Sequence, residues 1–547
     1  MSLPLANDLF RLGRSEDLWK MCCGFLDLDI TQFMEIQERL LLQQLQTLSQ
    51  SALGRKIMRG KAPQTLEEFR RMVPLTTYKD YCPELSEKME ENLPGKPELW
   101  AHSSGRSEEF PYKWIPLTHQ YIDSLSIILY GIGMISCAAY KGDTERIPKN
   151  AKLLYSVAPR PYISGTFADV LRLQTPLEYL PSLEQAETMT YEERIAAGFK
   201  QALSKGLDYF FGLSLVLVKV GEKLTSNSQK IDIRPLITKP KAIWRLTKGL
   251  VKSKIAGRKL LPKDIWNIRG IISSGIDSWV YKDKIKELWG RSPLDLYSCT
   301  EGSIIATQTW DYEGMTFIPN LNFLEFIPEE EQIKNAMDRS YQPKTLLLNE
   351  VQPGESYEIV ITSFHGGSLV RYRIGDVIKI TSLENKTCGI KTPQMAFEQR
   401  VDGILDFFVV RLTEKTIWQA IEKTGVPYND WVAYRIPGDI TLRILIEPQK
   451  GAIVDEKELS TAIQLNIMQT SDEKALYLKE DFINEMGFKV EIGLLAAGTF
   501  DRYTEQRQKE GADLAHIKPP HINPSDKVLE ALVPPEFKTK VLKNSEQ

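Results

Sequence analysis

A strand-forming pattern runs through Leu348–Ile380, which reads LNEVQPGESYEIVITSFHGGSLVRYRIGDVIKI. Its first half alternates between two sets of side chains: Tyr357, Ile359 and Ile361, and Glu358, Val360 and Thr362. This period of two predicts a strand whose two faces differ in polarity. The run SLVRYRIGDVIKI, which follows a glycine-containing turn, predicts a second strand.

Similar short apolar runs, separated by turn residues, begin near Trp266 and read IRGIISSG, LDLYSCTEG and TFIPNLNFLEFIP. The first hundred residues instead favour helices. Their apolar stripe, at near-helical spacing, consists of Ile36, Leu40, Leu41, Leu45 and Leu48. Helical stretches also lie between the later strands, so we predict a large α/β domain over residues 1–400.

A second unit begins near Arg400. FFVVRL, WVAYRI, ITLRILIEP and FKVEIGLL predict strands, and TEKTIWQAIEKTG predicts a capped helix that ends at Gly425. Two further helical stretches complete this part of the chain. We therefore expect a smaller, mobile α+β domain over residues 401–547, which makes the fold class α/β with two domains.

The composition is that of an ordinary globular protein, with 42% hydrophobic and 26% charged residues in a chain of 547. There are 69 basic and 72 acidic residues, so the net charge of −3 provides no basic field that would collect nucleic acid. Six cysteines in this length do not make a disulfide scaffold, and no two have the C-x-x-C spacing of a metal site.

Neither a secretory signal nor a membrane span is expected. The N-terminus, MSLPLANDLFRLGRSEDLW, has no apolar core behind a basic start. The most apolar run, Leu125–Ala139, is too short to cross a bilayer and predicts a buried helix instead. We therefore expect a cytoplasmic protein.

Nine basic and no acidic residues lie between Lys239 and Lys263. One interpretation is a docking strip for an acidic carrier protein, a phosphate or a membrane surface. The simpler interpretation, which we favour from the sequence, is the solvated face of a helix whose other face is apolar. That apolar face would hold Ile243, Leu246, Leu250 and Ile255.

Three short segments carry residues suited to nucleotide chemistry, although Walker, G-x-G-x-x-G, G-x-S-x-G and H-E-x-x-H sequences are missing. His102-Ser-Ser-Gly-Arg-Ser107, between a strand-like piece and an apolar helix, suits a phosphate nest to which Lys113 adds charge. Tyr297-Ser-Cys-Thr-Glu-Gly302 offers a carboxylate, and carboxylate plus phosphate is the usual way to hold Mg²⁺. Tyr372-Arg-Ile-Gly-Asp376 ends a strand with a carboxylate suited to ribose hydroxyls. Each segment alone is also typical of a plain turn.

Together and in this order, the three segments resemble those of the acyl-adenylate-forming superfamily. More narrowly, they resemble the auxin-responsive acyl-acid amido synthetase family and its bacterial relatives. The resemblance extends over nearly the whole chain and is most specific in Leu348–Ile380. Further matching segments are FRRMVPLTTYKDYCPEL, IISSGIDSWV, PNLNFLEFIP, FEQRVDGIL at the hinge, and GADLAHIKPP with the family's C-terminal lysine.

The resemblance implies a role for each matching residue. ATP phosphates would be held by Ser103, Ser104, Gly105 and Ser107. Ser274 and Gly275 would line the adenine pocket, and Tyr297 would stack on adenine. Asp376 would bind ribose, and Arg400 would lie near the hinge and the nucleotide. Thr300 would contact phosphate, Glu301 would hold Mg²⁺, and Lys518 would be a catalytic lysine that reaches in from the small domain.

The phosphate segment departs from the family pattern S-S-G-T-S-G-G. Arg106 replaces the threonine, and Glu108 and Glu109 replace the glycines. We expect Arg106 to pair with phosphate in compensation, because a guanidinium group suits that partner. A further departure is His521, which stands where the family often has arginine.

The implied reaction is ATP-dependent adenylation of a carboxylic acid to acyl-AMP, with release of pyrophosphate. Transfer of the acyl group to an amine then gives an amide. ATP and Mg²⁺ would be the cofactors, and the acid and the amine the small-molecule partners. Two alternatives stay open: an acid–thiol ligase that loads coenzyme A or a carrier-protein thiol, and a non-catalytic nucleotide- or acyl-binding relative.

Overall fold

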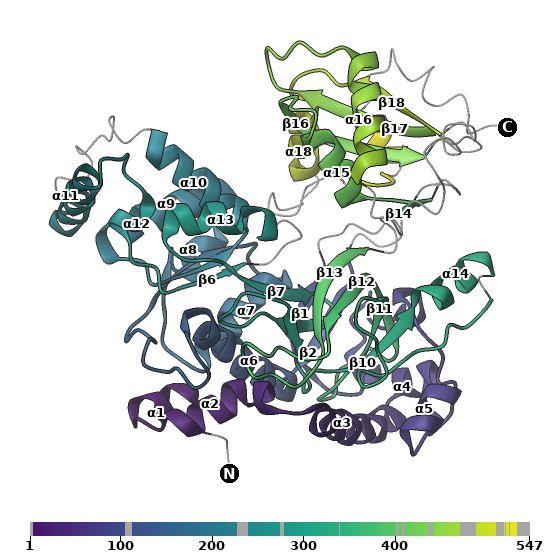
Figure 1. Cartoon of the computed structure of the whole chain (residues 1–547). Coiled ribbons are helices and arrows are strands. Elements are labelled where there is room, and N and C mark those ends of the chain that lie inside the picture. Colours follow the sequence, from purple (N-terminus) through teal and green to yellow (C-terminus); the bar gives the residue numbers. More distant parts are fainter. Residues whose placement is uncertain are drawn as a thin grey trace. The chain divides into compact units, whose positions relative to one another are not determined.

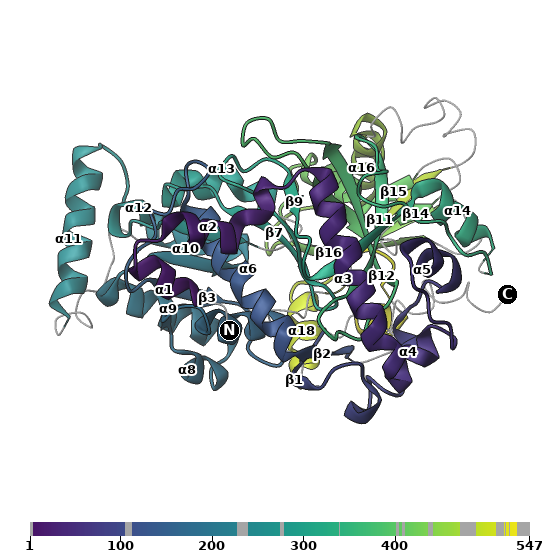
Figure 2. The ribbon, with the colours of Figure 1, turned by 90° about the horizontal axis from the view of Figure 1, so that it is seen from below.

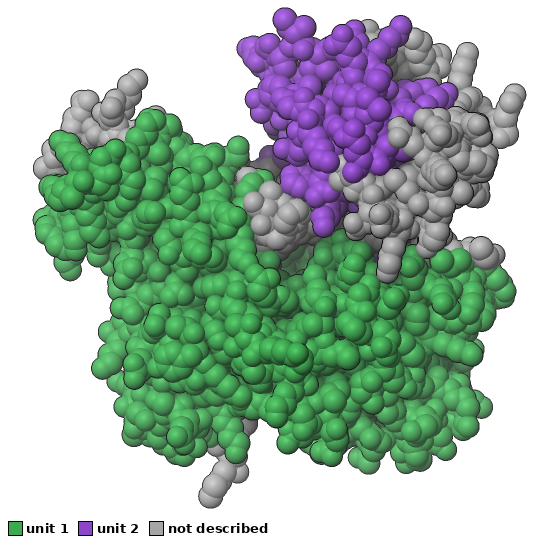
Figure 3. All heavy atoms as spheres, viewed as in Figure 1, with its two compact units in different colours: residues 1–105, 112–374, 378–398 green, residues 106–111, 375–377, 399–547 purple. Residues whose placement is uncertain are grey.

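The computed structural model describes residues 4–103, 112–226, 239–273, 278–338, 340–400, 404–406, 411–435, 441–470, 488–509, 519, 521–524 and 526–532. The chain divides into two compact units, shown in Figure 3. Unit 1 contains residues 1–105, 112–374 and 378–398, and unit 2 contains residues 106–111, 375–377 and 399–547. Both units combine helices with strands, so the predicted α/β class is confirmed.

Unit 1 begins with short helices that lead into one long helix. The elements are α1 (Ala6–Arg11), α2 (Ser15–Cys23), η1 (Gly24–Asp27), α3 (Ile30–Gln50), α4 (Ala52–Ile57), α5 (Leu66–Met72), η2 (Tyr78–Tyr81) and η3 (Glu90–Asn92). A capping box between Asp29 and Gln32 starts α3, which Figure 2 shows in purple along one side of the unit. The predicted apolar stripe is buried at Leu41, Leu45 and Leu48.

Two glutamines of α3, Gln37 and Gln44, are buried beside this stripe, which the apolar pattern did not predict. The Gln37 amide donates to the Asn322 carbonyl oxygen at 2.8 Å and accepts from the Leu324 N–H at 2.8 Å. The Gln44 amide donates to the Gly367 carbonyl oxygen at 2.7 Å. These bonds tie α3 to strand ends, because a buried amide is stable only when its polar atoms are paired.

Eleven of the described strands form a mixed sheet in the order β10-β11-β12-β13-β9-β8-β7-β6-β5-β3-β4. Figure 1 labels several of these strands, among them β10, β11, β12, β13, β7 and β6. In chain order they are β3 (Lys152–Ser156), β4 (Glu178–Leu180), β5 (Tyr209–Gly212), β6 (Gly270–Ser273), β7 (Leu294–Cys299), β8 (Ser303–Thr307), β9 (Met315–Phe317), β10 (Asn322–Pro328), β11 (Ser356–Ser363), β12 (Tyr372–Ser382) and β13 (Gln394–Arg400). The strands from β7 back to β4 are parallel neighbours, whereas β7, β8 and β9 are antiparallel. A separate hairpin pairs β1 (Pro97–His102) with β2 (Trp114–Thr118).

Helices connect the parallel strands, because a parallel pair needs a long crossover. They are α7 (Ile163–Arg172), α8 (Leu183–Glu187), α9 (Tyr191–Lys205), α10 (Ser214–Ser226), α11 (Pro240–Ile255), α12 (Pro262–Ile265) and α13 (Ser278–Trp289). Two further helices lie outside these crossovers: α6 (His119–Cys137) precedes β3, and α14 (Glu329–Met337) follows β10. Strand residues such as Phe210 and Ile271 share a buried cluster with Trp266 and Trp289. These two indoles stack with centroids 5.7 Å apart.

The apolar run near Leu125 forms helix α6. By length and composition α6 is long and apolar enough to cross a membrane, but 72% of its most apolar window is buried inside the protein. Within the described residues no other helix meets these criteria. A core helix is therefore the simplest account, as the sequence predicted.

The two faces of β11 differ in polarity, and both are buried, because Glu358 and Thr362 are as buried as its apolar residues. Glu358 is paired there with Arg373 at 2.7 Å. In α11 the predicted apolar face is only partly internal, since Leu250 and Ile255 are exposed.

Unit 2 is built around a three-stranded sheet in the order β16-β17-β18. Its elements are β14 (Ile404–Asp406), β15 (Arg411–Thr413), α15 (Glu414–Glu422), β16 (Tyr428–Arg435), β17 (Thr441–Pro448), α16 (Glu456–Thr470), β18 (Lys489–Leu494), α18 (Thr499–Lys509) and α19 (Asp526–Leu532). One face of the sheet packs Ile444 against Ile417 of α15 and Ile463 of α16. The other packs Leu445 against Phe500 of α18 and Leu529 of α19. Successive residues of β17 therefore point to opposite faces of the sheet and pack into two separate hydrophobic cores.

Candidate functional site

The β1–β2 hairpin brings Ser103 and Lys113 together. The Ser103 N–H donates to the Lys113 carbonyl oxygen at 3.1 Å, and the Lys113 N–H donates to Ser103 Oγ at 3.2 Å. The predicted phosphate segment therefore connects two antiparallel strands, and α6 follows only after β2. This corrects the expectation of a loop between a strand and a helix. The residues between them, Ser104, Gly105, Arg106 and Ser107, lie outside the described part of the chain.

Within this hairpin, His102 at the end of β1 is enclosed by aromatic rings. Its ring centroid lies 4.3 Å from that of Tyr112, 4.8 Å from Trp114 and 4.5 Å from Tyr162. Burial lowers the pKa of His102, so the ring is neutral near pH 7. Its Nδ1 lies 2.8 Å from the Ser103 carbonyl oxygen. The imidazole therefore helps to fix the backbone where the predicted phosphate segment begins.

The turn after β7 carries Thr300 and Glu301 and is fixed by its neighbours. The Gly302 carbonyl oxygen accepts from the Tyr121 hydroxyl at 3.2 Å and from the Asn322 amide at 2.8 Å. A Cβ at Gly302 would lie 3.0 Å from the Ile305 side chain, so a larger residue does not fit without movement. These contacts fix the backbone of the turn next to Glu301.

Glu301, Lys113 and Tyr372 form a polar cluster in unit 1, which we call the Glu301 cluster. Lys113 Nζ lies 3.6 Å from Glu301 Oε1 and 3.3 Å from the Tyr372 hydroxyl. The Tyr372 hydroxyl donates to Glu301 Oε1 at 3.4 Å. Burial and the charge of Glu301 raise the pKa of Tyr372, so its hydroxyl stays a donor. These contacts are long, and the carboxylate and the ammonium group keep bonding capacity for a ligand.

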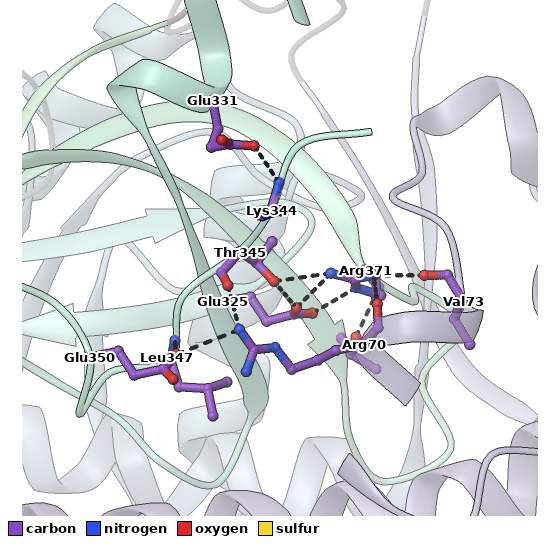
Figure 4. Close-up of polar contacts among 10 residues, drawn as sticks. Arg70, Val73, Glu325, Glu331, Lys344, Thr345, Leu347, Glu350 and Arg371 are labelled. Atoms are coloured by element: carbon purple, nitrogen blue, oxygen red, sulfur yellow. Dashed lines mark hydrogen bonds and ion pairs between the residues drawn. The ribbon is translucent and has the colours of Figure 1, made fainter. Parts of the chain in front are cut away.

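Arg371, the residue before Tyr372, anchors the start of β12 (Figure 4). Its guanidinium group donates to both Glu325 carboxylate oxygens, at 3.0 and 2.8 Å, and to Thr345 Oγ1 at 3.0 Å. It also donates to the carbonyl oxygens of Arg70 and Val73, at 2.8 and 2.6 Å. All five guanidinium N–H groups are therefore used.

The backbone of Arg371 has a φ of 45°, which a non-glycine residue rarely adopts. Such a conformation costs on the order of 1–3 kcal/mol and persists only when its surroundings enforce it. Here the bonds of the guanidinium group to Glu325 and Thr345 do so. The network therefore fixes the backbone direction where strand β12 begins, at the next residue, Tyr372.

The structure describes only some of the other predicted site residues. Tyr297 is buried in β7, with its ring centroid 5.9 Å from that of Phe397 in β13. Asp376 is buried inside β12 near its start, which corrects the prediction that it ends a strand. Arg400 is the last residue of β13, and its side chain is outside the description. Lys518 and the pair Ser274 and Gly275 also lie outside the described residues.

Sequence reasoning assigned no role to Tyr372, although it quoted the residue at the start of the third segment. The available signal was its place four residues before Asp376, in the chain's most specific segment. Only the fold shows that its hydroxyl meets Glu301 from a different strand.

The Glu301 cluster suits a magnesium ion that is bound together with a phosphorylated substrate. Among the described residues there is no group of three or more His, Cys, Asp or Glu side chains that would hold a metal alone. Mg²⁺ is commonly held by one or two carboxylates plus substrate phosphates, and Glu301 supplies one such carboxylate. Glu301 therefore fits Mg²⁺ that arrives with a nucleotide.

Two family models match this chain. Residues 23–161 match the GH3 family N-terminal domain, and residues 315–400 match the GH3 family central domain. The predicted resemblance to the acyl-acid amido synthetase family is thereby confirmed over these two segments.

Curated relatives match part of the chain. Jasmonoyl–L-amino acid synthetase JAR4 of Nicotiana attenuata is 28% identical over 277 residues, which cover 48% of this chain and 45% of that protein. The 4-substituted benzoates-glutamate ligase GH3.12 of Arabidopsis thaliana is 27% identical over 235 residues, which cover 40% of this chain and 38% of that protein. The chain thus matches less than half the length of these relatives.

Solved structures with the same fold cover nearly the whole chain. The acyl acid amido synthetase AtGH3.15, in complex with 2,4-DB, has a TM-score of 0.63 and 17% identity and covers 94% of this chain and 95% of its own. A 2-hydroxyisobutyryl-CoA ligase in the postadenylation state has a TM-score of 0.57 and 13% identity and covers 89% of this chain and 90% of its own. The chain therefore shares its fold with these two ligase structures.

Proposed function

We propose that this chain activates a carboxylic acid with ATP and passes the acyl group to an amine. A carboxylate oxygen of the acid attacks the α-phosphorus, the bond to the β-phosphate's bridging oxygen breaks, and pyrophosphate leaves. The amine nitrogen then attacks the acyl carbon of the acyl-AMP and loses a proton, and AMP departs with the bonding electrons. The Glu301 cluster beside the β1–β2 hairpin is the observation that carries the proposal.

In this proposal each part of the site has one task. Lys113, which Glu301 and Tyr372 hold in place, presents a fixed positive charge to the phosphates. Preorganised charges of this kind stabilise the negative charge that develops during phosphoryl-group chemistry. Glu301 would hold Mg²⁺, which when bound neutralises phosphate charge. The remaining nucleotide contacts are proposed for Ser103, Ser104, Gly105, Arg106, Ser107, Ser274, Gly275, Tyr297, Thr300, Asp376 and Arg400.

The acyl acceptor is proposed to be an amino acid. The support is that the curated relatives are named as amino acid or glutamate ligases and synthetases. A coenzyme A or carrier-protein thiol is the second candidate, and the fold shared with a CoA ligase favours it. The proposal also keeps two predictions: a division into residues 1–400 and 401–547, and a cytoplasmic location.

The first experiment measures ATP-dependent pyrophosphate release with a panel of carboxylic acids. We expect release that depends on one class of acid and on Mg²⁺. Adding amino acids or thiols then identifies the acceptor by the mass of the product. No release with any acid, together with intact ATP or acyl-AMP binding, would favour the non-catalytic relative.

Lys518 has a distinct expected signature, because charge develops on the α-phosphate only in the first step. Lys518→Ala should reduce pyrophosphate release by about 10²–10³ while largely sparing product formation from supplied acyl-AMP. Both half-reactions are measured on one preparation. An equal loss in both would argue against this role.

A further inference from the structure

Helix α11 carries four exposed apolar side chains: Leu250, which is 37% exposed, and three others that share one side of the helix. Trp244 is 62% exposed, Val251 51% and Ile255 83%. With 3.6 residues per turn, these three lie within about 40° of one another around the helix axis. They form one continuous line along the helix, which we call the α11 stripe.

The opposite face of α11 packs against the rest of unit 1. Its buried residues are Ala242, Leu246, Gly249 and Ser253. A Cβ at Gly249 would lie 3.2 Å from side-chain atoms of Ile265 and Leu260, so the contact is close. The α11 stripe therefore points away from the core, and α11 lies at the edge of unit 1 in Figures 1 and 2.

Exposed lysines stand on both sides of the α11 stripe. They are Lys241, Lys248 and Lys252 on one side and Lys254 on the other. Lys248 Nζ lies 4.9 Å from the Trp244 ring centroid. Between Lys239 and Lys263 the sequence has no acidic residue, and the next one, Asp264, is bound by Arg258 at 2.7 and 2.9 Å. The helix surface is therefore apolar and positively charged at once.

A purely solvated helix explains only part of this surface. Lysines near a helix C-terminus are favourable because they oppose the helix dipole. That effect accounts for Lys252 and Lys254, but it gives no reason for Trp244, Val251 and Ile255 to align opposite the core. Aligned exposed apolar side chains indicate an interaction surface.

We propose that α11 docks on an anionic phospholipid surface. An interfacial helix buries an apolar face at the boundary between headgroups and acyl chains, and its lysines reach the phosphates. The α11 stripe and its flanking lysines supply both parts. An acidic protein would satisfy the lysines but would bring carboxylates toward the apolar stripe, so the lipid surface is the better complement. This docking is independent of the adenylation chemistry.

The test is sedimentation of the full chain with vesicles at physiological ionic strength. One set contains phosphatidylcholine with one quarter phosphatidylglycerol, and the other contains phosphatidylcholine alone. Several lysines near an anionic surface each strengthen binding, so we expect at least about tenfold tighter association with the anionic vesicles. Equal binding to both sets, or none to either, would overturn the proposal.

The variant Trp244→Gln/Val251→Gln/Ile255→Gln should weaken this association about tenfold or more. Its matched control, Leu12→Gln/Leu173→Gln/Leu383→Gln, changes three other exposed apolar residues of unit 1 and should bind as the wild type does. A second variant, Lys241→Gln/Lys248→Gln/Lys252→Gln, should lose the preference for anionic lipid.

Unchanged melting temperatures and unchanged pyrophosphate release in all three variants separate docking from folding and catalysis. A stripe variant that binds anionic vesicles like the wild type would overturn the assignment. So would a chain that ignores vesicles but binds an acidic protein through the same lysines.

Discussion

Two neighbouring residues of unit 1, Arg371 and Tyr372, belong to ion-pair clusters of opposite character. Arg371 is buried, and each of its guanidinium N–H groups has a partner in the Glu325 network. Tyr372 instead belongs to the Glu301 cluster, whose ion pair is 3.6 Å long. A saturated network has nothing left to offer a ligand, whereas a loosely paired carboxylate does. Bonding capacity, rather than charge, therefore separates the structural cluster from the candidate site.

The largest expected effect is on stability, at Arg371. Arg371→Leu should lower the free energy of unfolding by about 3–5 kcal/mol, because it leaves the Glu325 carboxylate buried without its partner. Urea denaturation measures the loss. Arg14→Leu, which removes an exposed pair with Asp17, is the control and should cost less than about 1 kcal/mol.

The double variant Arg371→Leu/Glu325→Leu sharpens this test. Removing both charges should recover much of the stability, since no buried charge is then left unpaired. If Arg371→Leu alone were as stable as the wild type, the claim that the Glu325 network stabilises the fold would be wrong.

The second effect is on catalysis, at Glu301. Glu301→Gln keeps the shape of the side chain but removes its charge, so pyrophosphate release should fall by about 10²–10³ while the melting temperature stays nearly constant. Glu313→Gln is the matched control, because Glu313 pairs with Lys282 at 3.3 Å on the surface of the same unit. A large loss of stability in Glu301→Gln would show that this cluster too is structural.

The sequence revealed the buried ion pairs of the Glu325 network less well than it revealed the residues of the Glu301 cluster. Periodicity located most strands from Trp266 onward and the small domain's helix α15, because these elements depend on local patterns. It did not reveal that Glu358 and Glu325 are buried in ion pairs, because their partners, Arg373 and Arg371, stand in a different strand or just before it. A carboxylate in an alternating pattern is normally read as an exposed position.

The candidate site was predictable where its residues stand in short segments. Glu301 and Lys113 were chosen for their residue types and neighbours, and the fold brings them together. Tyr372 was assigned no role, because its contact with Glu301 arises from strands distant in sequence. The same kind of segment placed Asp376 wrongly at the end of a strand, whereas strand β12 continues past Asp376 to Ser382.

The third effect, in unit 2, depends on pH. His521 Nδ1 lies 2.6 Å from Glu414 and Nε2 lies 2.7 Å from Asp430, so both nitrogens donate only when the ring is protonated. Burial alone would lower the pKa of His521, but these two bonds raise it to about 9. Its stabilising contribution, on the order of 2–3 kcal/mol, is complete below about pH 6.5 and is lost as the pH rises through about 9.

This prediction is checked by denaturation across that pH range. His521→Gln should be less stable than the wild type at low pH, and the difference should shrink as the pH approaches 9. Because the His521 carbonyl oxygen accepts from the Ala433 N–H at 2.6 Å, the change should be local to β16 in hydrogen exchange. A wild type whose stability does not decline between these pH values would contradict it.

The smallest effect is expected at Asp376. Asp376→Ala should weaken ATP binding by about 1.5–3 kcal/mol, because a charge-assisted hydrogen bond to ribose would be lost. Calorimetric titration with ATP measures the change, and the affinity for pyrophosphate should be unaffected. An ATP affinity equal to that of the wild type would remove Asp376 from the proposed site.

The central claim is that the Glu301 cluster serves the adenylation of an acid. ATP–pyrophosphate exchange tests it most directly, because label moves from pyrophosphate into ATP only when acyl-AMP forms reversibly. We predict exchange that requires a carboxylic acid, persists in Glu313→Gln and falls at least about a hundredfold in Glu301→Gln. Acid-dependent exchange that is undiminished in Glu301→Gln would contradict the account.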